Sequence, residues 1–120
     1  MRILDSNIII YASQTAYSYL LPLLYDSDNF VSEISKLEVL GYHKFDSIAK
    51  KTLTDLFDTI QIIPIDSNII NKAIQIRQKQ KMSIGDSIVA ATAVLNKFEV
   101  ITSNVNDFNA LNLIVNNPII

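Results

Sequence analysis

Short apolar runs alternate along the chain with longer stretches in which apolar residues recur at helical spacing. The short runs predict buried strands, and they cover residues 2–4, 30–31, 60–65, 100–102 and 113–115. The longer stretches predict helices over residues 8–12, 16–25, 32–41, 46–59, 67–80 and 84–97, most of them beside a Ser or Asp that suits an N-cap. Strands that alternate with helices favour an α/β fold, with a parallel sheet covered by helices on both faces.

The same spacing predicts which face of each helix meets the core. In the stretch 46–59, the expected apolar face holds Ile48, Leu53, Leu56 and Phe57. In the stretch 32–41, Glu38 shares a face with the apolar Ile34 and Leu37, so its carboxylate is expected on the core side. In the stretch 84–97, Asp86 aligns with a row of small residues that should meet the sheet.

The composition excludes several kinds of chemistry. The chain has 120 residues, 49% of them hydrophobic, which suffices for the core of a single domain over residues 1–120. It has no Cys, which excludes disulfides, thiolate metal sites and a Cys nucleophile and fits a reducing cytoplasm. The net charge of −2 means that nucleic-acid binding would need a local basic patch. Residues 6–25 are uncharged, but polar residues and Pro22 interrupt them, so we expect neither a membrane span nor a targeting segment.

Acidic and amide residues follow the predicted strands or open the helices beside them. Asp5 ends the first strand, Glu38 lies in the helix after the second, and Asp86 opens the helix before the fourth. Asn104 and Asp107 follow that fourth strand. Ligands of such sheets bind beyond the carboxyl ends of the strands, so these five side chains are expected to converge there.

Converging carboxylates repel one another, and burial raises their pKa values, so they need a compensating cation. Oxygen ligands suit Mg²⁺ or Mn²⁺, and the chemistry that follows is metal-assisted hydrolysis, most naturally of a phosphodiester. The metal would lower the pKa of the attacking water. Thr102 or Asn104 could orient that water, and Asp107 could be a ligand or support one.

Each acid also has an ordinary structural explanation. Asp5 suits an N-cap, and Ser35-x-x-Glu38 and Ser83-x-x-Asp86 both match a common capping pattern. What favours a site is that Glu38 and Asp86 both fall on faces expected to meet the core. Unpaired ionised groups are rare in that position.

Four segments together carry a family resemblance. They are Asp5-Ser6-Asn7 after the first strand, Glu38-x-x-Gly41, residues 84–93 (IGDSIVAATA) and residues 100–108 (VITSNVNDF). In this order and spacing they resemble the PIN domain family, and within it the VapC-type toxins of prokaryotic toxin–antitoxin pairs. The resemblance implies a three-layer α/β/α fold with a mostly parallel central sheet. It also implies a Mg²⁺- or Mn²⁺-dependent endoribonuclease, active as a homodimer in a prokaryotic cytoplasm and neutralised by an antitoxin whose tail covers the active site.

The resemblance assigns roles to individual residues. Asp5, Glu38 and Asp86 match the three central metal-binding acids of the family. The fourth acidic position, often Asp, is Asn104 here, so a second metal ion would bind more weakly. Asp107 matches a frequent Asp-Phe ending and would compensate, which leaves one or two metal ions as alternatives.

Two further features point to a substrate and a protein partner. A basic group that includes Arg77, Lys79 and Lys81 precedes Asp86 and could hold RNA phosphates, although such runs are as often solvated faces. The residues expected to position substrate are Ser6, Asn7, Thr102, Arg77, Lys79 and Lys81. The segment 17–25 is apolar on more than one face, which suggests a surface for a second copy or for the antitoxin.

Other functions remain open from the sequence alone. A catalytically degenerate module of the same fold would bind RNA or protein without cutting, and Asn104 favours it. A response-receiver domain is disfavoured because it needs an acidic pair at the first strand and a Lys after the last. A phosphatase of the Asp-x-Asp type is disfavoured because Asn7 replaces the second Asp.

Overall fold

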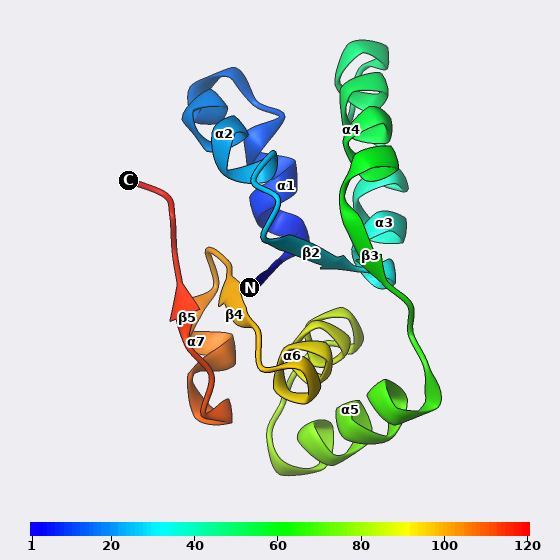
Figure 1. The fold of residues 1–120 in the computed structure, drawn as a ribbon, viewed down its shortest axis with the longest axis vertical. Coiled ribbons are helices and arrows are strands. Elements are labelled where there is room, and N and C mark those ends of the chain that lie inside the picture. The colour runs from blue at the N-terminus through cyan, green and yellow to red at the C-terminus, as the bar shows by residue number, and fades with distance from the viewer.

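The structure is a computed structural model of residues 1–120, and it describes all of them apart from the side chain of Ala110. Its centre is a sheet of five parallel strands in the order β3-β2-β1-β4-β5 (Figure 1). The strands are β1 (Arg2–Leu4), β2 (Asn29–Ser32), β3 (Gln61–Ile63), β4 (Glu99–Ile101) and β5 (Val115–Asn116). The parallel sheet predicted from the alternation of runs is therefore confirmed.

Helices cover both faces of this sheet, as expected. They are α1 (Ser6–Ala12), α2 (Leu21–Leu24), α3 (Glu33–Leu40), α4 (Ser47–Thr59), α5 (Ser67–Lys79), α6 (Ile84–Asn96) and α7 (Val105–Phe108). In one core cluster, the helices α1, α2, α3 and α4 pack against one face of the sheet through Leu4 and Ile101. In the other, α5, α6 and α7 pack against the opposite face through Ile3 and Val100. Neighbouring residues of one strand thus point to opposite faces, which makes three layers.

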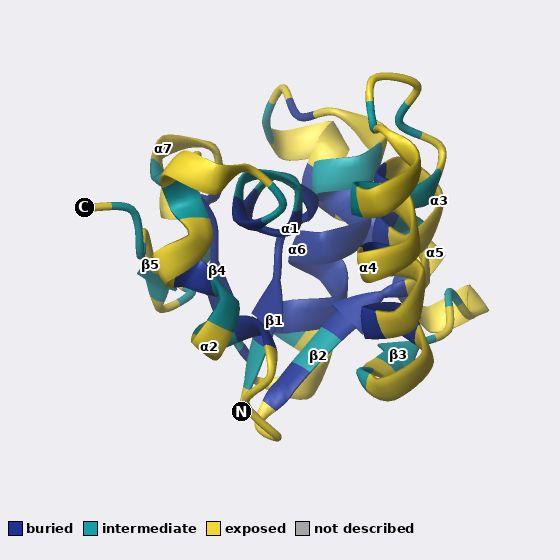
Figure 2. Cartoon of the chain, turned by 90° about the horizontal axis from the view of Figure 1, so that it is seen from above, coloured by how far each residue is buried: buried dark blue, intermediate teal, exposed yellow. Residues whose placement is uncertain are grey.

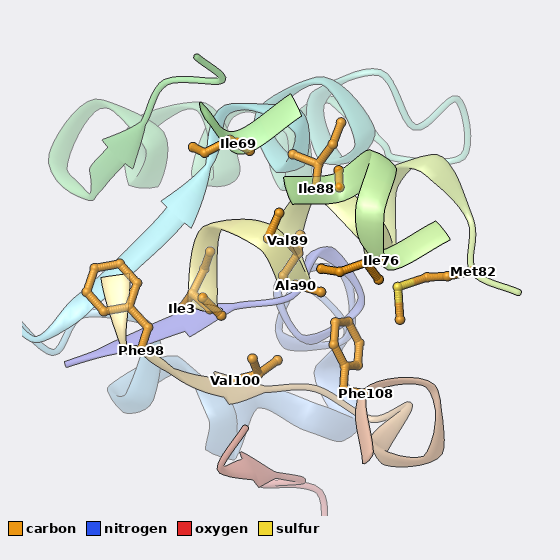
Figure 3. Packing of buried hydrophobic residues seen from close by; sticks show 13 residues of the cluster. Ile3, Ile69, Ile76, Met82, Ile88, Val89, Ala90, Phe98, Val100 and Phe108 are labelled. Atoms are coloured by element: carbon orange, nitrogen blue, oxygen red, sulfur yellow. The ribbon is translucent and has the colours of Figure 1, made fainter. Parts of the chain in front are cut away.

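The second core cluster is built around α6, a helix with seven buried residues, Ser87 to Ala93. Val89 and Ala90 are fully buried between Ile3 and Val100 of the sheet and the ring of Phe108 (Figure 3). Small side chains on this face let α6 lie close to the strands. Figure 2 shows the result: the central strands β1 and β2 are largely buried, the edge strands β3 and β5 are less so, and the outer faces of the helices are exposed.

Polar caps fix where the main helices begin. The side chains of Asp5, Ser32, Asp46, Asp66 and Ser83 each accept a backbone N–H of the helix that follows. These bonds satisfy N–H groups that have no partner within the helix. The predicted starts of α3, α4, α5 and α6 are confirmed to within one residue, whereas α1 begins at Ser6 instead of at residue 8. These starts set the position of the acids considered below.

The expectation of one helix over residues 16–25 is wrong. The chain forms a 3-10 helix, Thr15–Leu20, and then the short α2, with Tyr17 outside helical geometry at φ −115° and ψ 19°. Pro22 lies in the first turn of α2, where its missing N–H costs nothing, so the chain restarts a helix there instead of continuing one.

Two smaller expectations also need correction. Ile48 does not belong to the inward face of α4, since its side chain is 79% exposed while Leu53, Leu56 and Phe57 are buried. The polar turn expected after β4 contains α7 and a 3-10 helix, Asn109–Leu111. Among the helices that the structure describes, none has both the length and the apolar character needed to cross a bilayer.

Candidate active site at the carboxyl edge of the sheet

Asp5 occupies the first residue after the central strand. Its backbone N–H donates to the carbonyl of Ile101 on β4 at 2.9 Å, so the pairing of β1 with β4 fixes its position. Oδ1 accepts the N–H of Ser6 at 2.8 Å and Oδ2 accepts the hydroxyl of Thr102 at 2.7 Å. The carboxylate is only 4% exposed. Asp5 is therefore an N-cap, as one interpretation had it, and is also a buried acid at the edge where ligands bind.

Thr102 connects this acid to the loop after β4. Its buried hydroxyl donates to Asp5 and accepts the N–H of Asn104 at 3.0 Å. Nearby, Oδ1 of Asn7 accepts the N–H of Ser103 at 3.5 Å. These bonds hold the start of α1 against the loop before α7. Ser6, Asn7 and Thr102 thus all lie within the same group of contacts as Asp5.

Glu38 reaches the same edge from α3. The hydroxyl of Ser6 donates to its Oε1 at 2.7 Å, and its Oε2 lies against Gly85 at the start of α6. The expectation that Glu38 sits on the core face is wrong: the residue is exposed, and Ser35 and Val39 are the buried residues of α3. Burial of an unpaired ionised carboxylate is unfavourable, so the side chain of Glu38 remains in contact with water.

Asp86 lies in the first turn of α6 and is half-buried. Its backbone N–H donates to Oγ of Ser83 at 3.1 Å, so the predicted Ser83 cap is confirmed. The N-terminus of a helix favours negative charge, and this placement supports an ionised Asp86. Asp107 is an exposed residue of α7, and Asn104 is exposed just before that helix.

The electrostatics of the site come first from burial and then from the proximity of its acids. Burial raises the pKa of Asp5 from 3.8 to about 6; hydrogen bonds from Thr102 and Ser6 oppose this, and the charges of Asp86 and Glu38 add to it. Burial also raises the pKa of Asp86, and the charges of Asp107 and Glu38 raise it further, against a hydrogen bond from the Ser83 side chain. The four acids therefore share one electrostatic neighbourhood.

These acids lack a basic partner at contact distance. The ion pairs in the described part of the chain join Arg2 to Asp26 and Lys51 to Asp55, and neither pair touches the site. Among the described side chains, no three of His, Cys, Asp or Glu lie close enough to form a ready-made metal cage. Mg²⁺ usually keeps several waters and uses only one or two protein carboxylates, so this donor set still fits it.

The basic residues expected to meet substrate lie on the approach to α6. Arg77 and Lys79 belong to the last turn of α5, and Lys81 lies in the loop that leads to Ser83. All three residues are exposed. Nε of Arg77 donates to the carbonyl of Met82 at 3.0 Å, so this side chain also holds the loop in place.

Sequence reasoning did not single out Gly85. A Cβ atom added there would lie 2.7 Å from Oε2 of Glu38, closer than such atoms approach in proteins. The signal was available in the sequence, because glycine directly before Asp86 lies inside a predicted helix, where it is unfavourable.

The fold and the site together define a parallel α/β domain with an uncompensated group of acids at the carboxyl edge of its sheet. Residues 2–112 match the model of the PIN domain, so the chain belongs to the PIN domain family. Comparison with curated protein sequences gave no match. The predicted family is thus confirmed, together with its three-layer fold, and PIN domains are in general nucleases.

Solved structures similar to the chain come from toxin–antitoxin systems. A toxin–antitoxin complex from Klebsiella pneumoniae has 28% identity and a TM-score of 0.81 over 99% of this chain and 98% of the other. FitAcB from Neisseria gonorrhoeae has 24% identity and a TM-score of 0.78, with 98% of both chains covered. VapBC2 from Rickettsia felis, bound to a promoter DNA fragment, has 20% identity and a TM-score of 0.78, with 97% of both covered. The predicted likeness to VapC-type proteins is confirmed.

Proposed function

We propose that this PIN domain is the toxin of a toxin–antitoxin pair and a divalent-metal-dependent endoribonuclease that hydrolyses RNA phosphodiesters. The observation that carries the proposal is the meeting of Asp5, Glu38 and Asp86 at one edge of the sheet, with no basic side chain described in contact with them. Such a group of acids in a folded protein needs a cation, and a cation beside bound RNA makes phosphodiester hydrolysis the natural reaction.

Asp5 and Asp86 are the residues we assign as direct ligands of Mg²⁺ or Mn²⁺, because burial and the charges of neighbouring acids raise both pKa values. Glu38 and Asp107 would act beside them, directly or through water. The cation, when bound, would supply positive charge to the phosphate and make a water more acidic.

The other residues of the site have supporting roles. Thr102 fixes the orientation of the Asp5 carboxylate, and Ser6 fixes that of Glu38. Asn104 would contribute an amide to the pocket, with no charge. Lys79 and Lys81 would attract the RNA backbone through their positive charge, which gives salt-sensitive binding with little sequence readout.

The test is cleavage of end-labelled tRNA and mRNA by the purified protein in Mg²⁺, Mn²⁺ or EDTA. The native protein is expected to cut with either cation and not with EDTA, and Asp86→Asn is expected to lose at least about a hundredfold in rate. Glu33→Gln is the matched control, because Glu33 is an exposed acid of α3 that bonds the N–H of Ile65 instead. Cutting that survives EDTA or Asp86→Asn would contradict the proposal.

A second candidate function is a binding module of the same fold that does not cut. Asn104 favours it, because the neutral amide replaces the usual fourth acid of the pocket. In that case RNA or protein binding would survive EDTA, and Asn104→Asp would create cleavage where the native protein has none.

We further propose an antitoxin as partner, since the similar solved structures are toxin–antitoxin complexes. A partly apolar hollow between α2 and α4, lined by Leu21, Tyr25 and Ile48 among others, would receive it. The protein encoded beside this chain should then copurify with it and suppress RNA cleavage. Copurification that Ile48→Glu leaves unchanged would contradict this choice of surface.

A homodimer is the assembly we propose. Ile70, Ile74 and Ile84 are 41%, 50% and 62% exposed and line a second apolar hollow, between α5 and α6, which a second copy would cover. Sedimentation should give twice the chain mass of 13.5 kDa, and Ile74→Glu should shift the protein towards that single mass. A native protein that sediments at 13.5 kDa at micromolar concentration would contradict the dimer.

A further inference from the structure

Gly85 occupies a position where the backbone does not require glycine. It is the second residue of α6, and neither glycine of the chain has a positive φ. Glycine inside a helix is less favourable than alanine, because it loses more conformational freedom on folding. The reason for glycine must therefore lie in the space that its missing side chain leaves.

That space is occupied by one side chain. The three atoms nearest to a Cβ added at Gly85 all belong to the carboxylate of Glu38: Oε2 at 2.7 Å, and Cδ and Oε1 at 3.2 Å. A methyl group and a carboxylate cannot coexist at these distances. Any residue other than glycine at this position would push Glu38 aside.

The opposite side of the same carboxylate is held by Ser6. Its hydroxyl donates to Oε1 of Glu38 at 2.7 Å. The carboxylate thus lies between the first turn of α1 and the first turn of α6. On α6 it lies against Gly85, the residue directly before Asp86. Glu38 is an exposed residue, and its carboxylate lies at the end of a flexible side chain. Once displaced, the carboxylate is therefore free to turn into water.

We propose that Gly85 is a positioning residue: its missing side chain admits the Glu38 carboxylate to the group of acids, where Ser6 holds it near Asp86. The expected effect of Gly85 on metal affinity rests on the proposed function. Its effect on the position of Glu38 does not, and can be tested without metal. With alanine at position 85, Glu38 turns out of the pocket while α6 stays folded.

The first test is the crystal structure of metal-free Gly85→Ala beside that of the native protein. The expected result is that the bond between Ser6 and Glu38 is lost, that Glu38 adopts another rotamer, and that α6 is unchanged. An alanine variant that keeps this bond, with the carboxylate still against position 85, would overturn the proposal. Because this test needs neither metal nor RNA, it decides the role of Gly85 even if the protein is not a nuclease.

The second test is titration of the metal-free proteins with Mn²⁺, to compare dissociation constants. Gly85→Ala and Glu38→Ala are each expected to weaken binding by about tenfold, a usual size for the loss of a supporting group. The double variant should be no weaker than either single one, because both changes remove the same carboxylate. Glu33→Ala, on the same helix and outside the pocket, should keep the native affinity.

Two other outcomes are distinguishable. Native affinity in Gly85→Ala, or losses that multiply in the double variant, would overturn the role of Gly85 while leaving the metal site intact. A native protein that binds no Mn²⁺ would overturn the proposed function, and the metal-free crystal structures would still decide whether Gly85 positions Glu38.

Discussion

At the scale of single residues, Asp5 performs two tasks that compete. It caps α1 through Oδ1, and it sits nearly buried beside other acids, where its charge is unfavourable without a cation. The sequence pattern predicts both tasks, and the structure combines them. A residue that only capped a helix would be more stable in contact with water. The burial of the ionised Asp5 carboxylate therefore costs free energy, which we expect the binding of a cation to offset.

The first prediction concerns stability against pH in the absence of metal. The pKa of Asp5 is raised from 3.8 to about 6 in the folded protein, so the folded state binds this proton more tightly than the unfolded state. Asp5 therefore lowers the free energy of unfolding as the pH rises from 3.8 to 6, by about 3 kcal/mol in all. Asp5→Asn should be more stable than the native protein at pH 7, by about 1–3 kcal/mol, and not at pH 4.

Urea denaturation in EDTA between pH 4 and 8 measures this difference. Asp58→Asn, an exposed acid of α4, is the matched control and should follow the native curve. An Asp5→Asn variant whose difference from the native protein stays constant over this pH range would contradict the account.

The second prediction concerns the hydroxyl of Thr102. Thr102→Val keeps the shape of the side chain but removes the donor to Asp5 and the acceptor for the N–H of Asn104. The pKa of Asp5 should rise further, because the hydrogen bond from Thr102 lowers it. The free energy of unfolding should fall by about 1–2 kcal/mol. Carboxyl NMR titration and denaturation check the two effects. Thr102→Ser should restore both, and an unchanged Asp5 pKa in the valine variant would show that the bond is unimportant.

Residue roles could be predicted from the sequence where topology alone decides them. Asp5 and Asp86 follow from their places after a strand and at the start of a helix. The exposure of Glu38 could not be predicted, because α3 is short and a shift of one position moves the inward face from Ile34 and Glu38 to Ser35 and Val39. The contact of Glu38 with Gly85 joins residues 47 positions apart, and no local pattern encodes it.

At the scale of elements, local signals predicted both ends of α3, α4, α5 and α6 to within one residue. Caps such as Asp46 and Ser83 act within one turn, so their sequence pattern is sufficient. The stretch 16–25 forms two short helices because Pro22 starts a new helix, α2, after the 3-10 helix. α7 was missed because its four residues are too few to show a helical period.

The third prediction separates two residues of α4 that the sequence pattern placed on one face. Leu53 is 2% exposed and Ile48 is 79% exposed. Leu53→Ala should lower the free energy of unfolding by about 3 kcal/mol, since it leaves a cavity in the core. Ile48→Ala should change it by no more than about 0.5 kcal/mol. Thermal or urea denaturation checks both, and equal losses would mean that the orientation of α4 is different.

At the scale of the whole molecule, the strand order places the group of acids at one edge of the sheet. The chain runs from central β1 to β2 and β3 on one side, then crosses to β4 and β5 on the other (Figure 1). In sheets of this kind ligands bind where the strand order reverses, which here is beyond the carboxyl ends of β1 and β4. The bond from Thr102 to Asp5 spans this point, with α3 and α6 supplying the other acids. The alternation of strands and helices predicts this edge, although the strand order itself comes from the structure.

The most direct measurement is diffraction at the manganese absorption edge from crystals soaked in Mn²⁺. The account predicts an anomalous peak within about 2.5 Å of carboxylate oxygens of both Asp5 and Asp86. The same peak should be absent from Asp5→Asn crystals. A native crystal with no peak in this pocket, or with manganese bound only elsewhere, would contradict the claim that these acids form a metal site.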